Sequence, residues 1–248
     1  MSALDFLSPG PEALARSPME REARAAGARI ERRDGWNVAV AFGDAEAERE
    51  RCRSSVGFAD HSHLGKLELQ GRAEDLGGIA PLELGEATRA EEAWWCPYTP
   101  ERAIVLCEPG AAAELRERLS ASGEVSVTDV TAVHAALTLV GPLARELFAR
   151  FTAADLRDPV MPIRGFRPVS VGRVPGAVLR ESDDRWLMLF GAALGQYMWT
   201  VVADAAGHLG GGPVGTEALA RVDEPGGDDR SGAGQPAPSR TTEVASRA

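Results

Sequence analysis

The chain has 248 residues, which allows one large domain or two small ones, and we expect one. Its formal net charge of −10 disfavours a nucleic-acid partner, because a surface that binds phosphates needs an excess of Lys and Arg. The three cysteines form no C-x-x-C pair, which favours a reducing compartment, and no run of about 18 apolar residues predicts a membrane span. An early acid and two prolines at the start do not match a signal peptide, so we expect a cytoplasmic protein that does not contact a membrane.

The two ends of the chain are predicted to lie outside the folded domain. Residues 1–16 are interpreted as a flexible N-terminal segment. The acidic tail over residues 223–248 contains no Leu, Ile, Met or aromatic residue, so it cannot offset its ordering entropy by burial and we expect it to be disordered. The folded domain is then predicted over residues 17–222.

The first part of the chain predicts short helices alternating irregularly with strands. Caps and hydrophobic patterning identify these elements. In chain order they are a helix over 17–27 with Ser17 as N-cap, a strand over 36–42, an exposed helix over 44–55 with Asp44 as N-cap, a strand over 66–71 and a short helix over 72–79.

The second part continues without a regular strand–helix–strand period, which favours an α+β fold. Strands over 124–130 and 135–141 are joined too closely for a parallel crossover, so they should pair antiparallel or enter separate ladders. The other expected elements are a strand over 102–107, helices over 110–123, 142–151, 192–207 and 213–222, and a hairpin formed by 176–182 and 185–191.

Two histidines, His61 and His63, follow Asp60 and precede an alternating stretch. In a strand that is continuous from residue 61 they would share one face. Such a pair could bind a metal ion, but a catalytic zinc needs a third protein ligand, and neither His134 nor His208 lies in a ligand motif. We therefore predict no metal site, and interpret the pair as polar residues at the mouth of a core-facing strand.

The residues around this pair suggest two further chemistries. Asp60, His61 and Ser62 are the residue types of a hydrolase triad, but a triad converges from separate segments, so a hydrolase is disfavoured. Lys66 could form a Schiff base. Because it lies beside Glu68 on the polar face of the predicted strand, we expect a solvated ion pair instead.

Four stretches follow one another along the chain: "SSVGFADHSHLGKLELQG", "VTDVTAVHAALTLVGPLARELFARF", "VPGAVLRES" and "LGQYMWTVVADAAGHLGGGPVGTEAL". In this order they resemble the folate-binding domain shared by the glycine cleavage T protein, the dimethylglycine and sarcosine dehydrogenases and the heterotetrameric sarcosine oxidases. The resemblance covers nearly all of residues 17–222. It implies a single folate-binding domain of the glycine cleavage T-protein type, α+β in class and without the C-terminal barrel, and it places His61 and His63 near the pocket wall.

The chain departs from the T protein at two acidic motifs. An Asn-Asp-x-Gly-Gly-x-x-Asp-Asp stretch, whose acid sits near the reacting folate nitrogen, is replaced by "EEAWWCPYTPERAIVLCEPG", with Glu101 as the nearby carboxylate. The Gly-Glu-x-Gly-Phe-Glu segment, which supplies a pteridine-binding glutamate, is replaced by "ESDDRWLMLFG", whose Asp183 and Asp184 should face solvent. A one-domain chain that lacks this acid resembles the gamma subunit of heterotetrameric sarcosine oxidase.

Three functions remain open at this point. The first hypothesis is an accessory, gamma-like subunit without catalytic residues, in a hetero-oligomer with flavin-dependent amine oxidase subunits and within folate-linked one-carbon metabolism. The second is a stand-alone aminomethyltransferase that uses tetrahydrofolate, with Glu101 or Asp60 as the carboxylate that handles the amine proton. The third is a non-catalytic scaffold with a vestigial pocket. Tetrahydrofolate is the implied cofactor, and we do not expect this chain to hold it tightly.

Aromatic residues are the expected contacts of the flat pteridine ring. The segment "EEAWWCPY" is neither periodic nor polar, so we interpret it as irregular backbone that lines a planar-ligand pocket, or as a loop packed on the core. Trp95 and Tyr98 from this segment, together with Tyr197 and Trp199 from the predicted helix over 192–207, are the predicted cofactor-binding aromatics.

Arginines are the expected contacts of the glutamate tail of folate, because a guanidinium forms forked hydrogen bonds to carboxylates. Arg180 and Arg221 lie in segments that resemble the family's ligand-facing hairpin and closing helix. The alternatives are that Arg180 pairs across its hairpin and that Arg221 ends a helix, where a cation favours the dipole.

Overall fold

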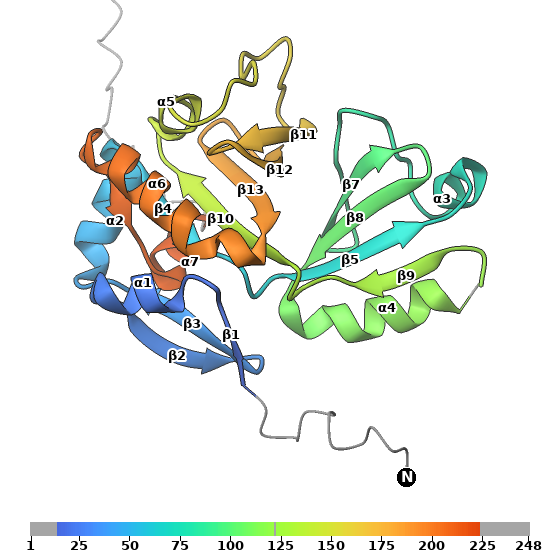
Figure 1. Ribbon diagram of the computed structural model, residues 1–248, viewed down its shortest axis with the longest axis horizontal. Coiled ribbons are helices and arrows are strands. Elements are labelled where there is room, and N and C mark those ends of the chain that lie inside the picture. The colour runs from blue at the N-terminus through green and yellow to red at the C-terminus, as the bar shows by residue number, and fades with distance from the viewer. Residues whose placement is uncertain (1–13, 122, 224–248) are drawn as a thin grey trace, which may run out of the picture.

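The computed structural model describes residues 14–121 and 123–223, with side chains up to residue 219. These residues form three β-sheets with helices packed on their outer sides, so the predicted α+β class is confirmed (Figure 1). Most of the predicted 1–16 and 223–248 segments lies outside the described residues. Ala15 and Arg16, placed in the N-terminal segment by the sequence, form a short strand instead.

The largest sheet has six strands in the order β11-β12-β13-β10-β4-β14. Its pairs are antiparallel apart from β14, which runs parallel to β4. The strands are β4 (Gly57–Asp60), β10 (His134–Val140), β11 (Phe166–Val171), β12 (Val174–Arg180), β13 (Arg185–Gly191) and β14 (Gly212–Pro213).

The other two sheets have five and three strands. The five-stranded sheet, of order β6-β7-β8-β5-β9, is antiparallel and consists of β5 (Gly65–Gln70), β6 (Thr88–Ala90), β7 (Ala93–Thr99), β8 (Arg102–Cys107) and β9 (Ser126–Asp129). The three-stranded sheet, of order β1-β3-β2, consists of β1 (Ala15–Arg16), β2 (Arg29–Arg33) and β3 (Trp36–Ala41).

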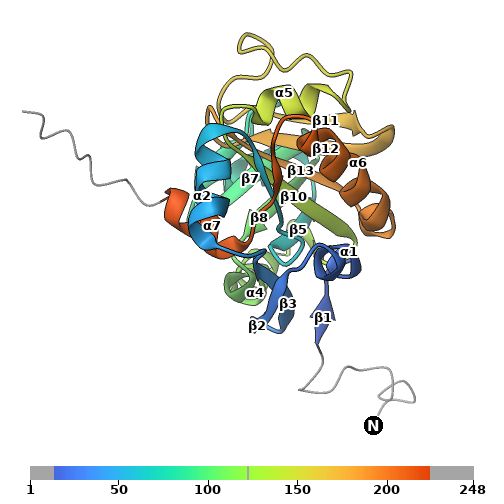
Figure 2. The same cartoon turned by 90° about the vertical axis from the view of Figure 1, so that its left-hand side faces the viewer.

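Helices cover the outer sides of these sheets. Figure 2 shows α2, α6 and α7 on the side of the molecule where the six-stranded sheet lies. The α-helices are α1 (Glu20–Ala25), α2 (Ala45–Ser54), α3 (Ala73–Ile79), α4 (Ala112–Ser120), α5 (Ala144–Ala149), α6 (Gly195–Gly207) and α7 (Thr216–Asp223). Two 3₁₀ turns, Pro109–Ala111 and Ala192–Leu194, lead into α4 and α6.

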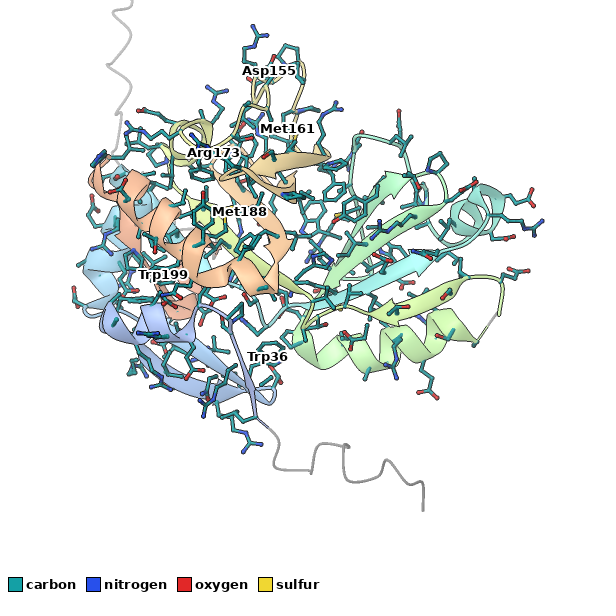
Figure 3. The ribbon with its side chains drawn as sticks, in the orientation of Figure 1. Trp36, Asp155, Met161, Arg173, Met188 and Trp199 are labelled. Atoms are coloured by element: carbon teal, nitrogen blue, oxygen red, sulfur yellow. The ribbon has the colours of Figure 1, made fainter. Side chains whose placement is uncertain are left out.

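The two larger sheets pack face to face, and each has helices on its other face. Leu187 of β13 and Ile104 of β8 belong to one buried cluster between the sheets. On the far side of the six-stranded sheet, Met188 of β13 and Trp199 of α6 share a second cluster (Figure 3). On the far side of the five-stranded sheet, Leu67 of β5 packs with Leu115 of α4. Both sheets are therefore buried on both faces.

Burial on two faces explains the largest error in the element prediction. The irregular backbone predicted over residues 91–98 is wrong, because residues Ala93–Thr99 form strand β7. Trp95 packs into the cluster below α3 and α4, whereas Cys96 faces the cluster between the sheets. A strand that buries both faces shows no polar–apolar alternation, and Pro97 adds a second misleading signal next to a break in the strand register.

The remaining elements agree with prediction in type, with a few differences. Strands β2, β4, β6, β11 and β14 were not predicted, and Pro213 of β14 was placed in a helix. The 124–130 and 135–141 strands enter separate sheets as β9 and β10, which was one of the two alternatives. The N-cap predicted at Ser17 is wrong, because α1 begins at Glu20 and the Ser17 hydroxyl donates to the Asp60 carboxylate.

A buried carboxylate joins α2 to the start of α7. Glu48 is 2% exposed, although its helix was expected to be exposed, and its oxygens accept hydrogen bonds from Phe42 N at 2.6 Å and Gly215 N at 2.7 Å. A Cβ atom at Gly215 would lie 2.0 Å from Val40 O, so glycine is required where the chain crosses β3. Glu48 thus satisfies two backbone donors at a point where the chain packs too closely for other partners.

Replacing Glu48 should therefore destabilise the fold. We expect Glu48→Ala to lower the free energy of unfolding by about 2–3 kcal/mol, because two charge-assisted hydrogen bonds are lost and the two N–H groups lose their partner. Glu48→Gln keeps one acceptor oxygen, so its free energy of unfolding should lie between those of the wild type and Glu48→Ala. Denaturant titration of the purified variants measures this.

The exposed Glu50 of the same helix is the matched control. Glu50→Ala should change stability by no more than about 0.5 kcal/mol. Equal effects of the two alanine variants would show that the Glu48 hydrogen bonds do not hold α7 in place.

Candidate functional site

Residues 61–64, the connector, join β4 to β5 and carry the chain from the six-stranded sheet to the five-stranded sheet. The ends of β5, β8, β9 and β10 converge at this place in Figure 1. The connector is fixed by backbone hydrogen bonds from His61 N to Ala136 O and from Leu64 N to His61 O, both 3.0 Å long. The continuous strand assumed from residue 61 is therefore wrong, because the chain leaves one ladder at Asp60 and enters the other at Gly65.

Lys66 holds this connector from within. It is 0% exposed, and its Nζ donates to Ser62 O at 2.9 Å and to Leu64 O at 2.8 Å. The solvated pair predicted with Glu68 is wrong, because the face of β5 that looked polar in the sequence lies against the other sheet. Glu68 bonds to Arg102 instead. Burial lowers the pKa of Lys66 to about 8, although the charge of Asp60 opposes the shift.

Asp60 is a second buried charged residue at the connector, and it does not line the cavity next to the connector. One of its oxygens accepts from Ser62 N at 2.9 Å, and the other accepts from the Ser17 hydroxyl. Burial raises the pKa of Asp60, while these hydrogen bonds and the nearby Lys66 oppose the shift. Asp60 is thus a structural residue of the junction, with one hydrogen bond to each of its oxygens.

A half-open cavity of about 610 Å³ lies beside the connector. Its volume is within the range of small-molecule sites. Turns and strand ends from all three sheets contribute to its wall, together with the start of α7. The residues used below are His61, His63 and Leu64 of the connector, Arg33 and Asp34 of the β2–β3 turn, Arg89, Glu92 and Trp94 of the β6–β7 hairpin, Leu106 and Glu108 near the end of β8, and Glu181, Arg185 and Leu187 of the β12–β13 hairpin.

The inner wall of the cavity is neutral. His61 is buried, and its Nδ1 lies 2.7 Å from the hydroxyl of Thr138 in β10. Burial and neighbouring positive charges hold the pKa of His61 well below its usual range, and burial lowers that of His63 to about 4. The two rings lie edge to face with centroids 5.6 Å apart. Both imidazoles are therefore uncharged at neutral pH.

The mouth of the cavity is charged with both signs. Asp34, Glu92, Glu108 and Arg89 are exposed, and the Arg89 guanidinium lies 5.2 Å from the centre of the Trp94 ring. A half-buried ion pair, Glu181 with Arg185 at 2.7 Å, lies on the wall contributed by the β12–β13 hairpin. This arrangement suits a ligand with a flat, uncharged ring system and polar or charged groups that reach the mouth.

The predicted cofactor-binding aromatics do not come together in this cavity. Trp95 and Trp199 are 4% and 6% exposed and belong to different cores on opposite sides of the sheets. Tyr98 packs edge to face on Phe166 between the sheets, and Tyr197 is exposed near the β11–β12 turn, with its hydroxyl donating to Gly172 O at 2.7 Å. Folate binding by these aromatics stays a prediction, and their positions do not favour it.

Arg180, one of the two predicted arginines, is likewise not part of the cavity wall. Arg180 is 4% exposed and donates to Asp158 at 2.6 Å, to Met161 O at 2.9 Å and to Asp183 at 2.9 Å. Pairing within its hairpin, the alternative stated for this residue, is what the structure shows. Arg221 lies in α7, and its side chain is outside the described residues.

Other residues considered from the sequence also lie elsewhere. Glu101 is exposed at the tip of the β7–β8 hairpin, and Asp183 and Asp184 are exposed as expected. Among residues 14–121 and 123–223, no group of three or more His, Cys, Asp and Glu side chains is arranged to hold a metal ion. In the same residues, no helix is long and apolar enough to cross a membrane.

Sequence reasoning missed the residues that form the mouth. Trp94 was passed over for its neighbour Trp95, because the two point to opposite faces of a strand that was not recognised. Glu181 was noted only as part of "ESDDRWLMLFG", the stretch that replaces a T-protein motif. The β6–β7 hairpin had no usable sequence signal, because Glu91 and Glu92 adopt the left-handed conformation (φ 51° and 62°) that glycine or asparagine usually occupies.

We compared the sequence and the fold of this chain with those of known proteins. No family model matches the sequence. The aminomethyltransferase of Synechococcus sp. strain CC9902 is 26% identical over 216 residues, which cover 75% of this chain and 58% of that protein. This chain spans about 60% of the length of the curated aminomethyltransferases that it matches.

Two solved structures share the fold. The glycine cleavage system aminomethyltransferase T from Bartonella henselae aligns with a TM-score of 0.69 and 17% identity, covering 83% of this chain and 60% of that one. A chain of the heterotetrameric sarcosine oxidase from Corynebacterium sp. U-96, in complex with pyrrole 2-carboxylate, aligns with a TM-score of 0.61 and 19% identity, covering 79% of this chain and 96% of that one.

The class of protein is therefore an α+β domain with the T-protein fold, and no additional C-terminal barrel is present within the residues described here. The resemblance of the chain to the folate-binding aminomethyltransferase family is confirmed.

The pKa of Lys66 can be measured directly, because Lys66 is the only lysine in the sequence. Protein labelled with ¹³Cε-lysine should show one side-chain resonance that titrates near pH 8 in the folded state and near 10.5 in denaturant. A folded-state midpoint of 10 or above would contradict the burial of the ammonium group.

The same shift determines the sign of a stability change with pH. The folded state binds fewer protons than the unfolded state between pH 8 and 10.5, so the wild-type free energy of unfolding should rise across this window relative to Lys66→Met. The expected rise is roughly 3 kcal/mol. The destabilising effect of burying the charge is fully present below pH 8.

Arg180 should be required for stability. We expect Arg180→Ala to lower the free energy of unfolding by about 2 kcal/mol, since Met161 O loses its donor and the Trp186 ring loses the guanidinium 5.2 Å from its centre. Arg145, which is half exposed and also pairs with Asp158, is the control. Arg145→Ala should cost no more than about 0.5 kcal/mol, and a similar loss in both variants would show that burial of Arg180 is unimportant.

Proposed function

We propose that this chain is a cytoplasmic, non-catalytic accessory subunit, gamma-like, of a sarcosine-oxidase-type complex in folate-linked one-carbon metabolism. Amine oxidation takes place on a flavin-bearing partner chain. The cavity beside the connector holds a reduced folate loosely, with the flat ring against the neutral inner wall and the carboxylates near the arginines of the mouth.

The observation that carries this proposal is the position of the two carboxylates considered for proton transfer. Asp60 is buried, is bonded to Ser17 and Ser62 and does not line the cavity. Glu101 is exposed at a hairpin tip formed by a different part of the sheet. A general acid or base must lie within hydrogen-bond reach of the proton that it transfers, and neither residue is positioned for a ligand in the cavity.

Two further findings support the proposal. The fold similarity to a chain of a heterotetrameric sarcosine oxidase covers 96% of that chain. The mixed charges and the neutral wall of the cavity suit a molecule such as folate, which combines a heteroaromatic ring with carboxylates.

A stand-alone tetrahydrofolate-dependent aminomethyltransferase is the second candidate. Glu181 favours it, because this carboxylate does line the cavity and its side chain is only 14% exposed. Its oxygen accepts a hydrogen bond from Arg185 at 2.7 Å, so this ion pair competes with proton transfer between Glu181 and a ligand.

Purification of the tagged full chain from its native host tests the first candidate. We expect a hetero-oligomer that contains stoichiometric flavin and oxidises an N-methylated amine, with its mass measured by light scattering. A chain that purifies alone, carries no flavin and transfers aminomethyl groups to reduced folate would contradict the proposal. A stable flavin-containing complex that does not bind folate would identify the scaffold instead.

Glu181→Gln separates the accessory subunit from the stand-alone transferase. In an accessory subunit, the rate of amine oxidation by the complex should change less than twofold. In a stand-alone transferase that uses this carboxylate for proton transfer, the turnover number should fall by about 10²–10⁴-fold.

A further inference from the structure

Of the two histidines on the inner cavity wall, His61 is the one whose ring is held by the protein at one nitrogen while the other nitrogen is left without a partner among the described residues. Its Nδ1 contacts the Thr138 hydroxyl, and its Nε2 makes no hydrogen bond within the described residues. The side chain is 9% exposed, and Nε2 is not among the polar atoms that are sealed from solvent without a partner. Because His61 lines the cavity, the solvent that reaches Nε2 is the solvent of the cavity.

The contact with Thr138 determines which nitrogen of His61 carries the proton. Thr138 is 0% exposed, and its hydroxyl makes no other hydrogen bond within the described residues. A buried hydroxyl proton without an acceptor costs more than an unused lone pair, so the hydroxyl donates to Nδ1. The neutral ring then carries its proton on Nε2.

The position of Thr138 makes this arrangement rigid. It lies in the middle of β10, which is paired on both sides with β4 and β13. The His61 backbone N–H donates to Ala136 O of the same strand. Both the main chain and the ring of His61 are thus hydrogen-bonded to one central strand, β10, which fixes the direction of the free Nε2–H.

A neutral donor recognises a different group from the cavity's arginines. Guanidinium groups such as those of Arg33 and Arg89 pair most favourably with carboxylates. An imidazole N–H offers one directional hydrogen bond without charge, which matches a carbonyl oxygen or a ring nitrogen of an uncharged heterocycle.

We propose that His61 is a ligand-binding residue, which donates a hydrogen bond from Nε2 to a carbonyl oxygen or ring nitrogen of the bound heterocycle, and that Thr138 is the positioning residue that fixes its tautomer. This inference rests on the proposed folate ligand. It places the flat head of the ligand at the connector, beside the apolar side chains of Leu64 and Leu187, which line the same cavity.

The tautomer is tested in the ligand-free full chain by the ring ¹⁵N shifts of its four histidines, with His61→Phe used to assign the signal. We expect the His61 signal to show a protonated Nε2 and an unprotonated Nδ1 at pH 7. Thr138→Val, which keeps the shape but removes the hydroxyl, should give a mixture of tautomers, and Thr138→Ser should restore the wild-type pattern. A protonated Nδ1 in the wild type would overturn the assignment.

The ligand contact is tested by calorimetry with 5-formyltetrahydrofolate, a reduced folate. His61→Phe, which keeps a ring but removes the donor, should raise the dissociation constant about three- to tenfold. Thr138→Val should weaken binding by a smaller factor, and Thr138→Ser should bind as the wild type does. His208→Phe, at an exposed position after α6, is the control and should not change the dissociation constant.

The outcomes separate this inference from the proposed function. Binding by the wild type with an unchanged dissociation constant in His61→Phe overturns the His61 contact alone. Absence of binding by the wild type overturns the folate ligand and, with it, the contact. The subunit role is decided independently, by co-purification with the flavin-bearing chain.

Discussion

The buried ammonium group of Lys66 is the interaction on which the arrangement of the two large sheets depends. An unpaired charge in an apolar interior is costly, and here the charge is offset by two backbone carbonyls of the connector and by the nearby Asp60. Because those carbonyls belong to Ser62 and Leu64, the connector must keep one conformation for the charge to remain satisfied. The cavity wall formed by His61 and His63 is therefore a consequence of how Lys66 is buried.

Two kinds of charged residue serve different purposes in this molecule. Buried charges such as Glu48, Lys66 and Arg180 bond mainly to backbone groups where elements cross, so they fix the positions of loops and helices. Charges at the cavity mouth are exposed, and water screens them until a ligand displaces it. The division explains why an arginine such as Arg180, which resembles a ligand-binding residue in the sequence, is a structural residue in the fold.

The relation to aminomethyltransferases is clearer in the fold than in the chemistry. The structure aligns with both an aminomethyltransferase and a sarcosine oxidase chain, which shows a shared fold. The carboxylates named from the sequence are outside the cavity, and those that line it are exposed at its mouth or paired with arginine. A shared fold does not by itself establish a shared activity, because packing and catalysis depend on different residues.

The sequence by itself determined the α+β class, the α-helices, about half of the strands, the cap at Asp44 and the family resemblance, because these depend on local periodicity and on ordered motifs. It could not determine which side of β5 or β7 meets solvent. The alternation around Lys66 predicted a polar outer face, and the lack of alternation around Trp94 predicted a loop. Only the tertiary structure decided both, because the face of a strand is polar or buried according to what packs on it, and here a second sheet covers it.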